Sequence, residues 1–555
     1  MKLILKNIWL ILLVIGFTAC NEDFLEIPVL VNPSPDSVDP ATAVTTAYSM
    51  NITGNASGYP NIRWKNWQGF IQGDALSDDA FKGGSSPGDQ PGWRELEVFE
   101  GGSGSTQTAN FWEVQYKKIY VANWALSMIE ESTTLPQALK NRYKGELIFL
   151  RSLNYFWLNR AYGGVSPVFG IGEEPSKRAS EADIYRRLEA DLKTAITFLP
   201  DEYGDADLGR ATKGAAKTLL AKIYLYQQKY QECFDMTAEI IQSGVYDLED
   251  DFMRIWDRGW VSAGDNEFGK ESIFEFTSAP TPEETNPSDM INAQRPRQGE
   301  FGLTAGWGVG TPTLDLLDAF ETGDPRIVST FLFHGDSIYR ETINFAVDAN
   351  NQANGANEHY MFSRKVIKPL SEAPEDNVKN NGDNVIIFRY ADVLLMYAES
   401  ANEIGNTSEA LAKLNDVRRR ARNSSRTDRA DIRPFINFGG KGDIIDRPFL
   451  GYDWEAVPAA SILPDVTVTD KTALRTIIWN ERRVELALEG ERFYDLVRQS
   501  KVVPNRVGNV MRSFAAKWNN EKGANFINGI HELLPIPQAE IDVLGSEMMP
   551  QNYGY

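Results

Sequence analysis

Histidine, a common metal ligand and general base, is scarce in this chain of 555 residues. The three histidines, His334, His359 and His531, lie far apart in the sequence. A histidine-rich metal site is therefore not expected, and no motif in a suitable context predicts a cofactor or a catalytic serine. No carboxylate pair for glycoside hydrolysis can be recognised either, because the separation of two carboxyl groups is a property of the fold.

Basic residues are also fewer than acidic ones. The chain has 56 lysines and arginines against 77 aspartates and glutamates, which gives a net charge of −21. A chain this acidic repels the phosphates of nucleic acids and anionic lipid headgroups, so no nucleic-acid partner is expected. A local basic cluster runs from Arg418 to Arg433. Its first arginines end a predicted helix, where positive charge is favoured, so we interpret the cluster as structural ion pairing.

Long apolar runs are missing as well. The run from Ile8 to Phe17 is shorter than the roughly 20 residues that are needed to span a bilayer. Lys2 and Lys6 precede this run, and a charged beginning followed by an apolar middle is typical of a secretory signal. Small residues then lead directly into Cys20, as in a bacterial lipobox.

We therefore predict that residues 1–19 are a lipoprotein signal peptide and that Cys20 is lipidated after cleavage. Stable anchoring takes two or more acyl chains, which the thiol and the new amino group of Cys20 would carry. The alternative is an ordinary signal peptide with a cysteine at this position by chance. With Cys20 lipidated, Cys233 has no partner, so no disulfide framework is expected.

Proline and helical periodicity divide the remaining chain. Residues 20–40 are predicted to be the lipidated N-terminus and an extended tether, because four prolines fall between Pro28 and Pro40. Residues 41–555 are predicted to be the folded part. Within it, apolar residues between Leu139 and Ala161 recur every three or four positions, which indicates one face of a long helix ending at Gly163.

Two further segments are predicted to be antiparallel helix pairs. One covers residues 219–241 with a polar turn at 227–229, and the other covers residues 393–421 with a turn at Gly405. Both are similar to tetratricopeptide units, although they are too far apart for a simple tandem array.

Between about residues 245 and 385 the helical period fades and Gly, Pro, Asn and Asp become frequent. Only residues 273–276 and 385–388 look like short strands there. The predicted fold is therefore mostly α, with helix pairs forming a scaffold and an irregular, loop-rich region packed on it. Long irregular stretches in compact proteins are often functional, so we expect the ligand side here.

Four stretches carry a family resemblance. Residues 388–399 read FRYADVLLMYAE, residues 479–498 read WNERRVELALEGERFYDLVR, residues 534–538 read LPIPQ, and residues 323–326 read GDPR. In their order along the chain these stretches resemble the SusD-like (RagB/SusD) outer-membrane lipoproteins, over essentially the whole mature chain. Residues 41–555 are therefore predicted to be a SusD-like domain. The stretches themselves are expected to build the fold, with Arg482 and Glu485 able to pair along one helix.

The resemblance implies four tetratricopeptide-like helix pairs and a function without catalysis. The family captures oligosaccharides at the cell surface, anchored to the outer membrane and facing the exterior. It works as a lid on a SusC-like TonB-dependent transporter, which carries the ligand inward. Some relatives handle peptides or glycopeptides, which is the alternative function, and a surface glycoside hydrolase is a third possibility.

A sugar site needs aromatic faces for C–H surfaces and polar groups for hydroxyls. One sugar covers roughly 100 Å² of one aromatic face, which contributes about 2–3 kcal/mol at about 25 cal/mol/Å². The family draws its site from the N-terminal region and from a loop in the irregular region. The candidates in this chain are Trp64, Trp67, Asp78, Trp93, Arg94 and Trp307. Alternatively, each tryptophan belongs to the core, and Asp78 and Arg94 cap turns.

Overall fold

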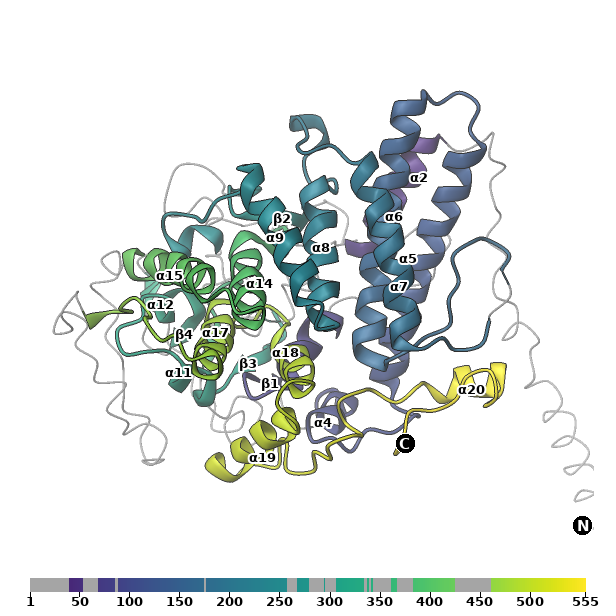
Figure 1. Cartoon of the computed structure of the whole chain (residues 1–555). Coiled ribbons are helices and arrows are strands. Elements are labelled where there is room, and N and C mark those ends of the chain that lie inside the picture. The colour runs from purple at the N-terminus through teal and green to yellow at the C-terminus, as the bar shows by residue number, and fades with distance from the viewer. Residues whose placement is uncertain are drawn as a thin grey trace, which may run out of the picture.

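The computed structural model describes residues 39–52, 68–84, 88–173, 176–256, 267–278, 294, 306–333, 337–338, 341–342, 361–366, 383–424 and 461–555. The predicted signal peptide, Cys20 and nearly all of the tether lie outside these residues, as do Trp64 and Trp67. The fold is mostly α, as predicted, with a broad layer of helices and a few short strands (Figure 1). Among the residues described, no helix is both long enough and apolar enough to cross a membrane.

The N-terminal part of the layer is built around one buried helix. Its helices are α2 (Pro40–Ile52), α5 (Thr106–Glu131), α6 (Gln137–Tyr162) and α7 (Glu181–Phe198). Helix α6 lies between α5 and α7, and most of its side chains beyond Tyr143 are buried. It ends where the sequence predicted, at Gly163, whose φ of 78° suits a residue without a Cβ.

Two helix pairs extend the layer and confirm the predicted tetratricopeptide-like units. They are α8 (Lys213–Tyr226) with α9 (Tyr230–Ser243), and α14 (Tyr390–Glu403) with α15 (Thr407–Asn423). Helix α9 packs directly against α14, although a long stretch of chain separates the two pairs (Figure 1). The pairs therefore continue one another in space without being a tandem array.

The C-terminal helices complete the scaffold. They are α17 (Lys471–Glu485), α18 (Arg492–Ser500), α19 (Arg506–Trp518) and α20 (Gln538–Leu544). Helix α17 packs on α14 and α15, whereas α18 packs on α19 and on α3 (Gln68–Ala75).

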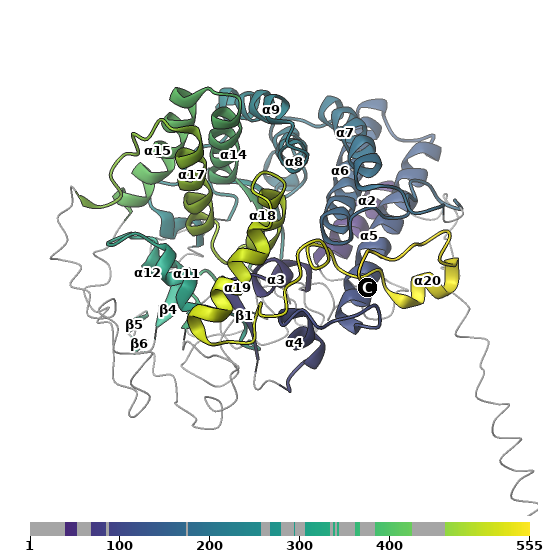
Figure 2. The same ribbon diagram turned by 60° about the horizontal axis from the view of Figure 1, so that its bottom comes forward.

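The strands form two-stranded antiparallel sheets. The pairs are β1 (Ala80–Gly83) with β3 (Val309–Pro312), β2 (Ser272–Phe276) with β8 (Val385–Arg389), β4 (Phe331–Phe333) with β7 (Met361–Ser363), and β5 (Ser337–Ile338) with β6 (Glu341–Thr342). Strands β2 and β8 are the two strands predicted from the sequence, and they pair with each other. Figure 2 shows β1, β4, β5 and β6 together on one side of the helix layer.

Short helices accompany these strands and connect the larger elements. They are α3 (Gln68–Ala75), α4 (Pro91–Glu97), α11 (Leu314–Ala319), α12 (Ile327–Thr330), η4 (Asp205–Asp207) and η5 (Phe252–Trp256). A separate hydrophobic cluster joins the strand side to the end of α17, with Ala80, Leu316 and Phe331 packed near Val484 and Leu488. The loop-rich region is thus attached to the scaffold by its own small core.

Candidate functional site

The β1–β3 ribbon brings the two predicted halves of the ligand region together. Gly83 pairs with Val309, and the N–H of Gly84 donates to the carbonyl of Gly308 at 2.7 Å. A side chain at Gly83, where φ is 69°, would overlap the backbone of Gly308. The chain at Trp307 therefore enters the same part of the molecule as the segment that contains Asp78.

Asp78 is occupied by protein partners. It is 1% exposed, and it accepts hydrogen bonds from Nε of Arg492 at 2.8 Å and from Nη2 of Arg492 at 2.9 Å. Arg483 lies 2.8 Å away on its other side. Burial alone would raise the pKa of Asp78, but the two guanidinium groups lower it below its ordinary value. Asp78 is thus a structural anion here, neither a turn cap nor an exposed hydroxyl ligand.

The neighbouring carboxylate of Asp79 shares the same arginine. Nε of Arg483 donates to Asp79 at 2.8 Å, and burial together with the charge of Asp78 raises the pKa of Asp79 to about 6 despite that partner. Asp74, earlier in the same segment, accepts a hydrogen bond from the backbone N–H of Gly490 at 2.9 Å. These contacts fasten the N-terminal segment to the loop between α17 and α18.

Trp93 and Arg94 lie side by side on α4 but in different environments. Trp93 is 3% exposed and belongs to the main hydrophobic core. Arg94 reaches the surface, where its guanidinium pairs with Glu97 at 3.0 Å and with Glu521 at 2.7 Å. Trp93 therefore lies in the core, which was the alternative to a ligand contact. Arg94 joins α4 to the C-terminal segment.

Among the predicted tryptophans that the structure describes, Trp307 is the one that keeps some exposed surface. It is half-buried and packs against the main core from the start of β3. Of the four candidates within the described ranges, Trp307 and Arg94 retain surface, whereas Trp93 and Asp78 do not. Those described ranges also contain no group of three or more His, Cys, Asp or Glu side chains arranged to hold a metal ion.

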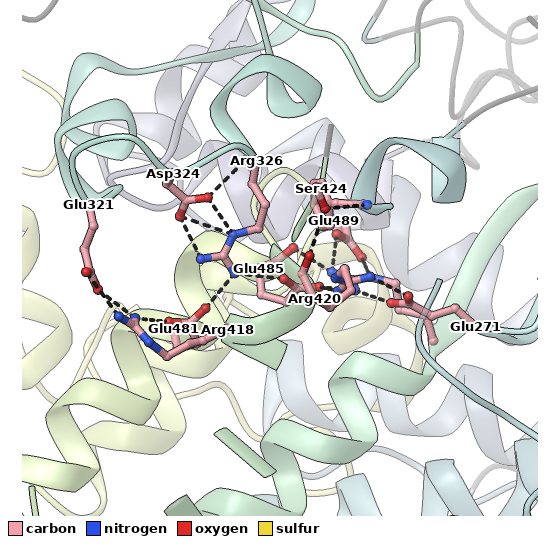
Figure 3. Close-up of polar contacts among 12 residues, drawn as sticks. Glu271, Glu321, Asp324, Arg326, Arg418, Arg420, Ser424, Glu481, Glu485 and Glu489 are labelled. Atoms are coloured by element: carbon pink, nitrogen blue, oxygen red, sulfur yellow. Dashed lines mark hydrogen bonds and ion pairs between the residues drawn. The ribbon is translucent and has the colours of Figure 1, made fainter. Parts of the chain in front are cut away.

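A buried ionic cluster, which sequence analysis did not predict as a unit, lies between the loop-rich region and the scaffold (Figure 3). We call it the arginine–glutamate cluster. Its members are Glu271, Asp324, Arg326, Arg389, Arg418, Arg420, Glu481, Glu485 and Glu489. Three of the stretches that carried the family resemblance supply most of these residues, so those stretches meet in space.

Glu485 on α17 is the centre of the cluster. Its carboxylate accepts hydrogen bonds from Arg326 at 2.9 Å and from Arg389 at 2.7 Å, and it also pairs closely with Arg420. Burial would raise the pKa of Glu485, yet the three guanidinium groups hold it well below the ordinary value. Each member thus compensates the desolvation of another, as buried charges require.

The same contacts explain the basic cluster seen in the sequence. Arg418 pairs with Glu321 at 2.7 Å and with Glu481 at 2.8 Å, while Arg419 pairs with Asp416 at 3.0 Å. The interpretation as structural ion pairing is therefore confirmed for the arginines of α15. Residues 425–433, with the remaining arginines, lie outside the described residues.

The predicted pairing of Arg482 with Glu485 is wrong. Arg482 pairs instead with Asp392 and, at 2.7 Å, with Asp495. The reason is burial, because both side chains are desolvated and each meets opposite charges from neighbouring elements. The helical spacing alone could not reveal these partners.

With this geometry established, comparison with known proteins identifies the family. The family model described as "SusD family" matches residues 270–555. The chain belongs to the SusD family. A second model, described as "Starch-binding associating with outer membrane", matches residues 94–225 of this SusD-family chain. The SusD-like resemblance found in the sequence is thereby confirmed.

Relatives and solved structures extend over most of this SusD-family chain. "SusD-like protein P2" of Formosa agariphila is 25% identical, with 83% of each chain covered. A SusD-like protein of Bacteroides ovatus is 22% identical, with 89% of this chain and 82% of the relative covered.

Two solved structures share the fold. A "Laminarin binding SusD-like protein" is 25% identical with a TM-score of 0.67, and the match covers 93% of this chain and 99% of that one. "Surface glycan-binding protein A" of Bacteroides thetaiotaomicron, solved with laminarihexaose, is 20% identical with a TM-score of 0.67, over 92% and 98% of the two chains.

Proposed function

We propose that this protein captures a neutral oligosaccharide at the cell surface and delivers it to a SusC-like TonB-dependent transporter, without cleaving it. The observation that supports this most is the shared fold, over 93% of the chain, with a laminarin-binding SusD-like protein. The anchor in this proposal is the lipid on Cys20, which keeps the protein on the outer membrane beside the transporter.

The chemistry of the β1–β3 region is consistent with binding and offers little for catalysis. Asp78 and Asp79 are each 1% exposed and face arginines, so a polysaccharide bond has no access to them in this arrangement. Trp307 supplies the accessible aromatic ring, and Trp64 and Trp67 remain proposed as further ligand contacts. In this site, Arg94 is proposed to act at the surface rim.

The proposal is tested by isothermal titration of the protein with laminarihexaose and other neutral hexasaccharides. Binding in the micromolar to millimolar range is expected, because a few stacked rings must overcome the cost of association. Removing one stacking face of about 2–3 kcal/mol in Trp307→Ala should weaken binding by roughly 30-fold or more. Trp157→Ala, which removes a half-buried tryptophan from α6, is the matched control and should bind normally.

Three results would overturn the proposal or its site. Full affinity in Trp307→Ala would show that the ligand is held elsewhere. Shortened products after incubation with a polysaccharide would replace capture by hydrolysis. Binding to a peptide library, with no binding to any glycan, would establish the peptide-capturing alternative.

A further inference from the structure

A cavity of about 530 Å³ opens between α5, α6 and α7, on the part of the layer shown at the right in Figure 1. The loop at residues 169–171 forms its fourth wall. No residue of β1, α4 or β3 is among those that line it. Its volume lies within the roughly 300–1,000 Å³ that is usual for small-ligand sites. This cavity is therefore separate from the region around Trp307.

One wall of the cavity is the half-buried indole of Trp124 on α5. Within the described part of the chain, no group accepts a hydrogen bond from its ring N–H. Met128, Ile148 and Ile171 add apolar surface around it, and Ile171 is 36% exposed at the lip. The indole thus presents both an aromatic surface and a spare donor to the cavity.

A second wall of the cavity, formed by Arg151, Phe169 and Arg187, is closely hydrogen-bonded. Arg151 donates to Asn123 and to the carbonyl of Phe169, both at 2.9 Å, and to Asp191 at 2.8 Å. Arg187 donates to the same Asp191 at 2.9 Å and stands 4.1 Å above the ring of Phe169. These contacts hold the wall in place before any ligand arrives, which lowers the ordering cost of binding.

The charges around the cavity compensate one another. Lys144 pairs with Glu130 at 3.0 Å, and the two arginines of the second wall share Asp191. Glu131 stands at the rim, and among the described residues its carboxylate has no partner. Three basic and three acidic groups therefore balance, so the cavity does not select a charged ligand. It offers donors and acceptors side by side, which suits hydroxyl groups that both donate and accept.

We propose that this cavity is a second saccharide-binding site, which takes an end or a branch of the neutral oligosaccharide. The inference rests on the proposed glycan capture and adds a second point of contact to it. Trp124 stacks on a sugar ring, and Glu131 and Arg187 bind its hydroxyls. Two weak sites on one protein would hold a long polysaccharide more tightly than a short oligosaccharide, because the second contact becomes intramolecular.

The test uses the full chain extracted from membranes in detergent, with the neutral hexasaccharide that gives the strongest titration signal. Wild-type protein should bind two molecules. Trp124→Ala should lose one of them or weaken it at least about tenfold, whereas Trp307→Ala should lose the other. Glu131→Ala should weaken the same site as Trp124→Ala. The Glu131 side chain is exposed and unpaired, so it can be removed without disturbing the core. If Trp124→Ala does not fold, Glu131→Ala therefore decides whether the second site exists.

Each outcome separates this inference from the proposed function. If wild-type protein binds no neutral hexasaccharide, both are refuted. If it binds one molecule, and that binding depends on Trp307 but is unchanged in Trp124→Ala or in Glu131→Ala, the second site is refuted and glycan capture stands. Trp157→Ala is again the matched control, since Trp157 lines no part of the cavity.

Discussion

Neutralising Glu485 is expected to be among the most damaging single changes in this fold. Glu485→Gln keeps the size of the side chain but removes the charge that faces Arg326, Arg389 and Arg420. It also points an amide donor at guanidinium groups that only donate. Removing one partner of a buried ion pair costs about 3–5 kcal/mol, and here three arginines each lose one of their carboxylate partners. Since single domains are stable by roughly 5–15 kcal/mol, the loss is a large fraction of the total.

Urea denaturation followed by tryptophan fluorescence at pH 7 measures this loss by linear extrapolation. Arg186→Gln is the control, because the side chain of Arg186 is 74% exposed in its pair with Asp183. Its unfolding midpoint should match that of the wild type, as expected for surface pairs. If Glu485→Gln also unfolded at the wild-type midpoint, the arginine–glutamate cluster would not be what stabilises the junction.

The pH dependence gives an independent check on the same residue. The folded pKa of Glu485 lies below its ordinary value of 4.5, so its contribution is fully present above pH 4.5. That contribution is lost as the pH falls through the lower, folded value, because the unfolded chain binds the proton first. The stability difference between the wild type and Glu485→Gln should therefore shrink below about pH 4. A difference that stays constant down to pH 2 would contradict the assignment.

Two further predictions concern single residues. Lys118 is 3% exposed, and burial lowers its pKa from 10.5 to about 7. Apart from packing, its only interaction with the described residues is with the ring of Trp157, whose centroid lies 5.6 Å from the ammonium nitrogen. Between pH 7 and 10.5 the unfolded chain holds a proton that the folded chain lacks, so wild-type stability should rise with pH. Lys118→Met should abolish that slope in denaturation curves, and it should be more stable than the wild type at pH 6 by up to about 5 kcal/mol. A retained slope would refute this. Cys20→Ser should release the protein from membrane fractions yet leave hexasaccharide affinity unchanged in titrations, and weaker binding would link the anchor to the site.

The helical scaffold could be predicted because its signals are local. Apolar spacing identified α6 and both helix pairs, and the glycines at positions 163 and 405 marked real ends, with φ of 78° and 85°. The two predicted strands also exist, since alternating and β-branched residues favour strands directly.

The candidate site was predicted less well, because exposure depends on distant partners. Trp93 and Trp307 both lie among glycines in the sequence, but α4 turns the first into the core, whereas β3 leaves the second half-exposed. Asp78 meets Arg492 across 414 positions of chain, a separation that no local pattern encodes. Trp124, in contrast, falls within an ordinary helix, so its place beside a cavity became visible only once α6 and α7 were in position.

The order of residues in the arginine–glutamate cluster has a consequence for synthesis. Arg326, Arg389, Arg418 and Arg420 leave the ribosome before Glu481 and Glu485, which provide much of their compensating charge. A nascent chain that ends before α17 therefore holds guanidinium groups that cannot be buried without a large desolvation cost. The middle of the protein therefore stays open and solvated until the segment from Lys471 onward is present. Chains cut short before α17 should consequently be cleared by proteases instead of surviving as smaller folded forms.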